Sequence, residues 1–182
     1  MNETDEILYC RYLESRKNED LKVLLERHRE GLTLFLFGIV HNMEDAEELM
    51  LDAFAEAAVR TRWKKEGASF KTWLFGVGRN LAFAFLRKNR RTAELSELAA
   101  APAPDEELFK EERDRQLYVA LSRLQDDYRQ ALYLIYLEDL SVEETAAVMK
   151  KTKKQIYNLT ARGKAALQEE LERTGFDHAQ FR

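Results

Sequence analysis

Aromatic, cationic and amide side chains alternate between residues 70 and 90, and these types suit a particular noncovalent chemistry. Aromatic planes stack on unpaired bases, and cations beside them hold phosphates. The residues of this mixture are Phe70, Trp73, Phe83, Phe85, Arg79, Asn80, Arg87 and Arg90. The stretch therefore predicts a surface for opened DNA. Aromatic residues at helical spacing are also typical of a core. The apolar residues expected to pack there are Phe54, Leu74, Phe75, Val77, Leu81 and Phe85.

Carboxylates form a second constellation, which precedes the first. They recur at offsets of three, four and four residues as Asp45, Glu48, Asp52 and Glu56. At this spacing they share one face of a helix, and Leu49 is expected to supply an apolar anchor at its centre. An acidic stripe of this kind predicts a docking face for an electropositive protein.

Two helix starts lie close together in the last third of the chain. Ser141 with Glu144, and Thr152 with Gln155, each pair a hydroxyl residue with Glu or Gln three positions later, which predicts two capping boxes. Helices that begin so close together indicate a helix-turn-helix, whose second helix enters the major groove with its first residues at the base edges. The side chains presented there are Lys153, Lys154, Gln155, Tyr157 and Asn158. An ordinary solvated helix hairpin remains the alternative.

Helices are expected to position all three constellations. The predicted helices lie near residues 4–16, 20–41, 43–62 and 70–89 in a first block, and near 106–124, 126–137, 141–149 and 152–173 in a second. The apolar run 32–40 fits a strand by periodicity alone, but its continuation from Asp20 favours helix. An Ala-rich segment that contains Pro102 and Pro104 reads as a linker. The prediction is an all-α chain with domains at 1–91 and 106–182, joined by a linker at 92–105.

Composition sets outer bounds on the function. The 182 residues have 45% hydrophobic content, seven glycines and two prolines, which suits one or two small helical domains. No run of about 18 apolar residues and no signal peptide is found, so a cytoplasmic protein without membrane insertion is expected. A single Cys10 and three scattered histidines offer no disulfide and no metal-ligand spacing. Neither a metal nor another cofactor is expected. No phosphate loop or nucleophile-base pair predicts an enzyme.

The charge of the chain is uneven. Its net charge of −4 argues against coating DNA by bulk electrostatics, since counterion release needs clustered cations. Basic residues nevertheless gather near residues 60–65, 79–91 and 150–164. This pattern predicts DNA contact that is weak alone and becomes useful when a larger partner supplies further affinity.

The chain resembles an alternative sigma factor of the extracytoplasmic-function group, the minimal members of the bacterial sigma-70 family. The family signature D-A-E-D-L-x-Q-E-x-F is similar to residues 45–54, and F-x-x-W-L followed by Asn matches Phe70, Trp73, Leu74 and Asn80. In the second block, E-x-A matches Glu144 and Ala146, and R-A-[RK]-x-x-L resembles residues 162–167. The resemblance covers residues 20–171.

This resemblance implies two contacts with core RNA polymerase and two with promoter DNA. The acidic stripe would dock on the clamp helices of the β′ subunit, and the second block, with Leu132 and Ile135, on the flap of the β subunit. The helix-turn-helix would read the upstream (−35) element with the five side chains named above and with Arg162. The residues implied in binding the melted strand of the downstream (−10) element are Lys64, Lys65, Ser69, Phe70, Trp73, Asn80, Arg87 and Arg90. An anti-sigma factor would hold the protein inactive in trans.

Several positions depart from the family pattern. Leu51 stands in place of the usual Gln, Asp52 in place of Glu, and Ala84 in place of Asp. Lys150 stands where glycine is often found at the turn, so a left-handed backbone there would carry a steric cost. Two other functions therefore stay open: a stand-alone helix-turn-helix regulator that dimerises through the first block, and a sigma-like adaptor without promoter recognition.

Overall fold

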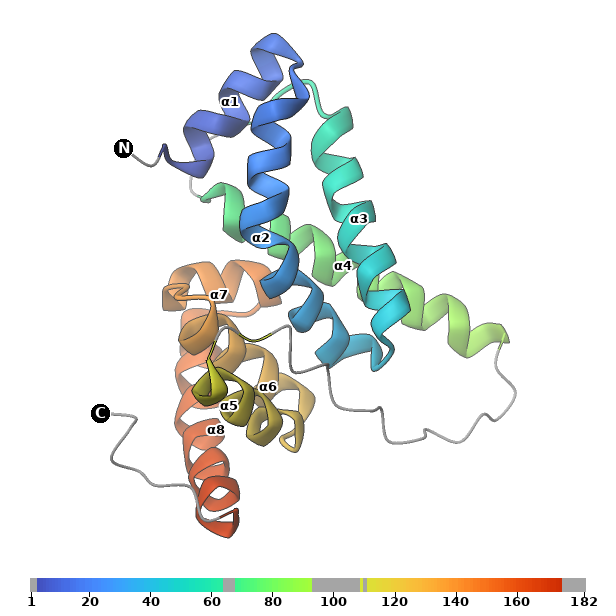
Figure 1. The fold of residues 1–182 in the computed structure, drawn as a ribbon. Helices are drawn as coiled ribbons and strands as arrows, with labels where there is room; N and C mark the ends of the chain where they lie inside the picture. Colours follow the sequence, from blue (N-terminus) through green and yellow to red (C-terminus); the bar gives the residue numbers. More distant parts are fainter. Residues whose placement is uncertain (1–2, 64–67, 93–108, 110, 175–182) are drawn as a thin grey trace. The chain divides into compact units, whose positions relative to one another are not determined.

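The structure is a computed structural model that describes residues 3–63, 68–92, 109 and 111–174 (Figure 1). All regular structure within these residues is helical, which confirms the predicted fold class. The chain divides between Pro102 and Ala103 into two compact units. The predicted linker lies, from residue 93 onward, outside the described residues.

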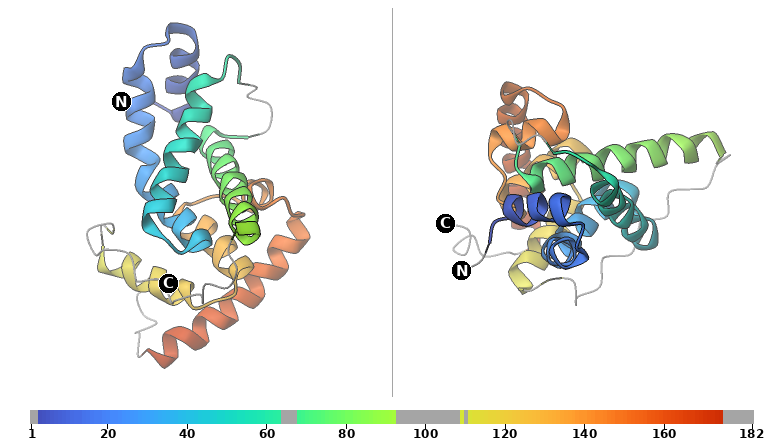
Figure 2. Two further views of the ribbon diagram at one scale, coloured as in Figure 1. Left: turned by 90° about the vertical axis from the view of Figure 1, so that its right-hand side faces the viewer. Right: turned by 90° about the horizontal axis from the view of Figure 1, so that it is seen from above.

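The described residues of the first unit form four helices: α1 (Asp5–Ser15), α2 (Asn18–Val40), α3 (Met43–Val59) and α4 (Phe70–Thr92). Helix α2 packs against the other three, and α3 also packs against α4 (Figure 2). The apolar run 32–40 belongs to α2, so the prediction of helix is confirmed. Because α2 has neighbours on several sides, its apolar residues do not follow the period of a helix with one buried face.

The centre of the first unit is apolar and aromatic. Side chains with no exposed surface come from all four of these helices, and those of α3 are alanines. The largest of them are Tyr9, Leu24, Leu32, Leu36, Phe70, Leu74 and Phe75. Of the predicted core residues, Phe54, Leu74 and Phe75 are buried, whereas Val77, Leu81 and Phe85 are half-buried.

The second unit contains α5 (Glu112–Ser122), α6 (Asp126–Leu132), the π-helical turn η2 (Tyr133–Leu137), α7 (Val142–Met149) and α8 (Lys153–Arg173). Helix α8 packs against α5, α6 and α7. Helix α5 begins later than the predicted residue 106, because Glu111 has an extended backbone and is the N-cap. The predicted helix 126–137 is continuous, but it changes from α to π geometry at Tyr133.

Candidate nucleic-acid and polymerase interfaces

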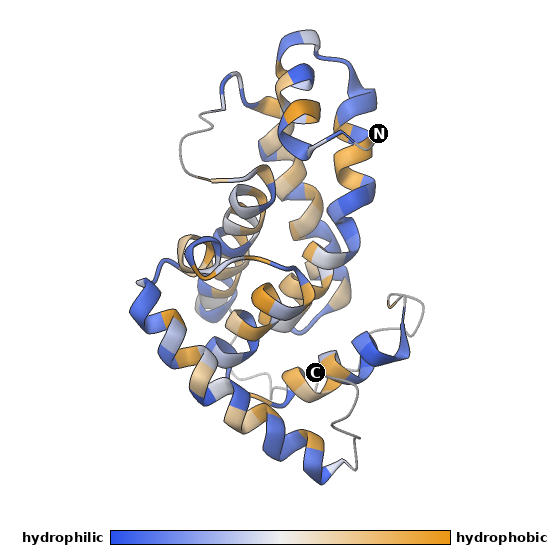
Figure 3. Ribbon diagram, turned by 90° about the vertical axis from the view of Figure 1, so that its left-hand side faces the viewer, coloured by the Kyte–Doolittle hydropathy of each residue, from blue (hydrophilic) through white to orange (hydrophobic). Residues whose placement is uncertain are grey.

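Helix α8 presents one polar side and buries the other. Ile156 has no exposed surface and Gly163 is buried, whereas Tyr157 is 58% exposed. The predicted DNA-contacting residues are all exposed, namely Lys153, Lys154, Gln155, Tyr157, Asn158 and Arg162. Hydrophilic and hydrophobic residues alternate along the helix accordingly (Figure 3). The structure thus brings these six side chains to the outside of one helix, five of them in its first two turns.

Both predicted capping boxes of the helix-turn-helix are present. The Glu144 N–H donates to Ser141 Oγ at 3.1 Å, and the Ser141 N–H donates to Glu144 Oε2 at 2.9 Å. At α8, the Gln155 N–H donates to Thr152 Oγ1 at 3.2 Å, and the Thr152 N–H donates to Gln155 Oε1 at 2.8 Å. These bonds satisfy helix-start donors that have no partner within the helix. They also engage the amide oxygen of Gln155.

The turn between α7 and α8 contains a left-handed residue, at the position where the family often has glycine. Lys150 has φ 53° and ψ 44°, and its N–H donates to Ala146 O. The Lys151 N–H also donates to Ala146 O, at 3.0 Å, so this carbonyl accepts two hydrogen bonds at the end of α7. A non-glycine residue in this region costs roughly 1 kcal/mol.

An ion pair at the start of α8 escaped sequence analysis. Lys153 Nζ lies 2.6 Å from Glu143 Oε1 of α7, and both side chains are exposed. The hydrogen bond from Lys153 holds the pKa of Glu143 below its ordinary value, and the same bond raises the pKa of Lys153. Glu143 therefore offsets part of the positive charge of Lys153 at the start of α8. Residues ten apart in sequence give no local signal of this contact.

The acidic stripe lies on α3 as predicted, but the leucine predicted as its apolar anchor is buried. Glu48, Asp52 and Glu56 are exposed, and Asp45 is half-buried at the helix start, where its N–H donates to Asn42 Oδ1. Leu49 is only 6% exposed, so its prediction as the anchor is wrong. Leu49 is one of the buried residues of α3.

Two other apolar side chains occupy the exposed side of α3. Leu51 is 54% exposed and Val59 is 73% exposed. Leu51 follows Glu48 by three residues, and Val59 follows Asp52 by seven, so helical spacing places each beside the stripe. The departure from the family motif at position 51 is therefore the residue that supplies exposed apolar surface.

Leu132, predicted to touch the polymerase flap, is also a core residue. It has no exposed surface, and a Cβ at Gly163 would lie 3.0 Å from its Cδ1 atom. The absence of a side chain at Gly163 allows α8 to approach α6 this closely. Ile135 is half-buried and the next residue, Tyr136, is 44% exposed, with Lys164 Nζ 5.5 Å from the centre of its ring.

At the start of α4, the prediction that Phe70 binds DNA is wrong. Phe70 has no exposed surface, and its ring centre lies 4.7 Å from that of Tyr9 and 5.9 Å from that of Trp73. Ser69 is half-buried, and its Oγ accepts the Thr72 N–H at 3.1 Å, so this hydroxyl caps the helix. Both residues hold the beginning of α4 in place.

Trp73 begins an exposed row along α4. Trp73, Asn80 and Arg87 recur every seven residues, which places them on one face of the helix, and Arg90 follows one turn later. Trp73 is half-buried, while the other three are exposed. The guanidinium carbon of Arg60 lies 4.6 Å from the centre of the Trp73 ring. Lys64 and Lys65 lie outside the described residues.

No helix among the described residues is long and apolar enough to cross a membrane. In the same part of the chain, no group of three or more His, Cys, Asp or Glu residues is arranged to hold a metal ion.

Family comparisons match both units. The model of "Sigma-70 region 2" matches residues 24–92, and that of "Sigma-70, region 4" matches residues 114–167. The RNA polymerase sigma factor CarQ of Myxococcus xanthus is 32% identical over 131 residues, which cover 69% of this chain and 74% of that protein. The ECF RNA polymerase sigma factor SigX of Bacillus subtilis is 23% identical over 166 residues, which cover 85% and 84% of the two chains.

Solved structures show the same fold. RpoE of Bartonella quintana, in complex with the anti-sigma factor NepR, aligns with a TM-score of 0.67 and 25% identity over 85% of this chain and 98% of that one. CnrH, in complex with the cytosolic domain of CnrY, aligns with a TM-score of 0.66 and 20% identity over 94% and 99% of the two chains. The two units are thus those of a sigma-70 protein. The chain belongs to the extracytoplasmic-function sigma factors of this family.

A sigma factor of this family is not an enzyme; it directs RNA polymerase to promoters. This confirms the function that the sequence motifs indicated. The stand-alone regulator and the adaptor find no support in the comparisons.

Proposed function

We propose that the exposed face of α3 docks on the clamp helices of the β′ subunit of core RNA polymerase. Three exposed carboxylates, Glu48, Asp52 and Glu56, support this proposal, together with half-buried Asp45. Leu51 replaces Leu49 as the apolar contact, because it is exposed and lies beside the carboxylates. Apolar surface surrounded by charge is a common arrangement at a protein interface.

In the second unit, the start of α8 reads the upstream promoter element. One observation carries this proposal: a helix whose other side is buried presents six polar residues outward, namely Lys153, Lys154, Gln155, Tyr157, Asn158 and Arg162. Gln155 and Asn158 suit base edges, whereas Lys153, Lys154 and Arg162 suit phosphates or guanine. Ile135 and exposed Tyr136 replace Leu132 as the contacts for the β flap.

The row on α4 binds the melted strand of the downstream element. Trp73 provides an aromatic plane for stacking, and Asn80, Arg87 and Arg90 continue the row with a hydrogen-bonding amide and two cations. Stacking on one aromatic ring contributes about 1–3 kcal/mol for each base. Lys64 and Lys65 belong to the same proposed surface by the family resemblance.

We further propose that this chain acts in the cytoplasm, where core polymerase works, and that an anti-sigma factor regulates it. The complex of its solved relative RpoE with an anti-sigma factor supports this regulation. A protein that covered the α3 face would prevent docking on the polymerase.

Transcription with purified core polymerase tests the proposal. The template is a library in which the upstream and downstream elements are randomised, and each reaction is run with and without this protein. We expect new initiation at one defined pair of motifs. Binding to core without initiation would favour the adaptor, and absence of binding to core would favour the stand-alone regulator.

A further inference from the structure

Helix α1 holds the end of α3, just before the segment that leads to α4. The Tyr9 hydroxyl donates to Ala57 O and the Tyr12 hydroxyl donates to Ala58 O, each at 2.9 Å. Arg16 donates to Ala58 O at 3.1 Å and to Arg60 O at 2.7 Å. The last carbonyls of a helix have no partner within it, so these donors cap α3 from outside.

The same helix also holds the beginning of α4. The Phe70 N–H donates to Glu6 Oε1 at 3.0 Å, across 64 residues of sequence. A carboxylate at this place satisfies a free helix-start donor and interacts favourably with the helix dipole. Residues on α1 thus fix both sides of the segment between α3 and α4.

The two tryptophans of the chain, Trp63 and Trp73, flank this segment. Their ring centres lie 5.7 Å and 6.0 Å from that of Tyr9, which has no exposed surface, whereas both indoles are half-buried. Burial raises the pKa of Tyr9 to about 12, so its phenol stays protonated and donates to Ala57 O at neutral pH. The buried Tyr9 ring therefore supports the indole rings of Trp63 and Trp73, which remain partly accessible to solvent.

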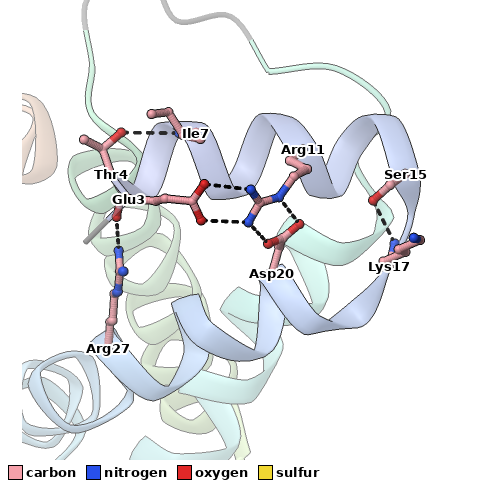
Figure 4. Close-up of polar contacts among 8 residues, drawn as sticks. All are labelled: Glu3, Thr4, Ile7, Arg11, Ser15, Lys17, Asp20 and Arg27. Carbon is pink, nitrogen blue, oxygen red and sulfur yellow. Dashed lines mark hydrogen bonds and ion pairs between the residues drawn. The ribbon is translucent and has the colours of Figure 1, made fainter. Parts of the chain in front are cut away.

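Helix α1 has its own attachment to α2, away from the tryptophans. Arg11 binds the carboxylates of Glu3 and Asp20, and Arg27 donates to Glu3 O at 2.8 Å (Figure 4). His28 Nε2 lies 2.6 Å from Asp5 Oδ2. This network holds α1 as a rigid support. Helix α1 also precedes residues 24–92, the part that the region 2 model matches.

We propose that α1 positions Trp63 and Trp73 for the melted promoter strand, with Glu6 and Tyr9 as the positioning residues. This inference rests on the proposed function of the α4 row. Glu6 fixes where α4 begins, and Tyr9 fixes the end of α3 and supports both indoles. Capture of unpaired DNA consequently depends on α1, while docking on core polymerase depends on the carboxylates of α3.

Binding of single-stranded DNA by the holoenzyme tests this inference. The probe is a fluorescently labelled strand that carries the downstream element selected in the transcription experiment. We expect Glu6→Ala and Tyr9→Phe to weaken its binding roughly three- to tenfold, the effect of one lost hydrogen bond, with unchanged affinity for core. Glu6→Gln keeps an acceptor oxygen for the Phe70 N–H and should restore binding.

Tyr12→Phe is the matched control. It removes the same kind of bond from the neighbouring carbonyl, but Ala58 O keeps Arg16 as a donor. Binding of the strand should stay within about twofold of the unchanged protein. Tryptophan fluorescence of the free protein, excited selectively over its tyrosines, gives a reading without DNA, because Trp63 and Trp73 are the two tryptophans of the chain. Glu6→Ala and Tyr9→Phe should shift it to longer wavelength, and Tyr12→Phe should not.

Trp73→Ala separates this inference from the proposed function. If Trp73→Ala weakens strand binding but Glu6→Ala and Tyr9→Phe do not, the positioning inference is wrong and the proposed function stands. If Trp73→Ala leaves binding unchanged, the assignment of the α4 row itself fails. Equal losses of core and strand binding in Glu6→Ala, Tyr9→Phe and Tyr12→Phe would reduce α1 to a general structural role and overturn the inference.

Discussion

The beginnings of α4 and α8 both carry candidate DNA-binding residues, yet they are built in different ways. At α8, Thr152 and Gln155 cap the helix within three residues. At α4, Ser69 supplies a local cap, but Glu6, Tyr9 and Arg60 come from other elements. A helix start made by its own residues keeps its geometry when distant packing changes. One made by distant residues depends on the whole unit.

Phe70→Ala should give the largest effect of these variants. It tests whether the start of α4 depends on packing against residues from other elements. The ring has no exposed surface, so its loss should lower the free energy of unfolding by about 3–5 kcal/mol. Chemical denaturation followed by circular dichroism measures this change. Exposed Tyr157→Ala is the control, with an expected change within about 0.5 kcal/mol. Normal stability together with lost strand binding would instead make Phe70 a DNA contact.

Thr152→Ala tests the local construction of α8. Loss of the hydroxyl that accepts the Gln155 N–H should cost about 1 kcal/mol of stability and weaken binding to the upstream element. Denaturation and gel-shift titration of the holoenzyme measure the two effects. Thr152→Ser keeps the acceptor and should behave like the unchanged protein. If serine fails to restore binding, the methyl group rather than the cap is what α8 needs.

Lys150→Gly sharpens the comparison at the turn before α8. Glycine adopts φ 53° without the Cβ clash, so the free energy of unfolding should rise by roughly 0.5–1 kcal/mol. Lys154→Gly is a matched control within α8, where glycine should lower stability by about 1 kcal/mol. Thermal unfolding measures both changes: the unfolding temperature should rise for Lys150→Gly and fall for Lys154→Gly. A loss of stability in both variants would show that the backbone at Lys150 carries no strain.

Glu143→Gln should give the smallest effect, because the pair with Lys153 is exposed. Release of Lys153 should raise affinity for upstream duplex DNA by about two- to fivefold in low salt, and the gain should fade as salt increases. Fluorescence anisotropy over a salt series measures it. Glu169→Gln makes the same charge change on an exposed part of α8. An equal gain from that variant would assign the effect to net charge.

The difference between the locally capped start of α8 and the start of α4, which depends on distant residues, explains which features could be predicted from sequence. The capping boxes and the exposed face of α8 follow from residues near one another in sequence, and both are confirmed. Phe70 was assigned to DNA because an aromatic residue beside cations fits either a core or a stacking surface. Its burial against residues distant in sequence, such as Tyr9 and His28, shows that it is core.

Helical spacing alone also could not orient α3 or α6. Periodicity groups residues on a face, but it does not say where that face ends and the core begins. Leu49 lies close enough in angle to the carboxylates to share their face, yet it is buried, while Leu51 is exposed. Leu132 is buried because Gly163 lets α8 approach it, a pairing of residues 31 apart.

The left-handed backbone at Lys150 has an evolutionary consequence. Asparagine enters this region more readily than lysine does, and a single base change converts a lysine codon into an asparagine codon, whereas glycine needs two. The turn can therefore gain stability in one mutational step without altering α8 itself. Such a reserve would let the reading face of α8 accept destabilising changes while the protein acquires a new promoter preference.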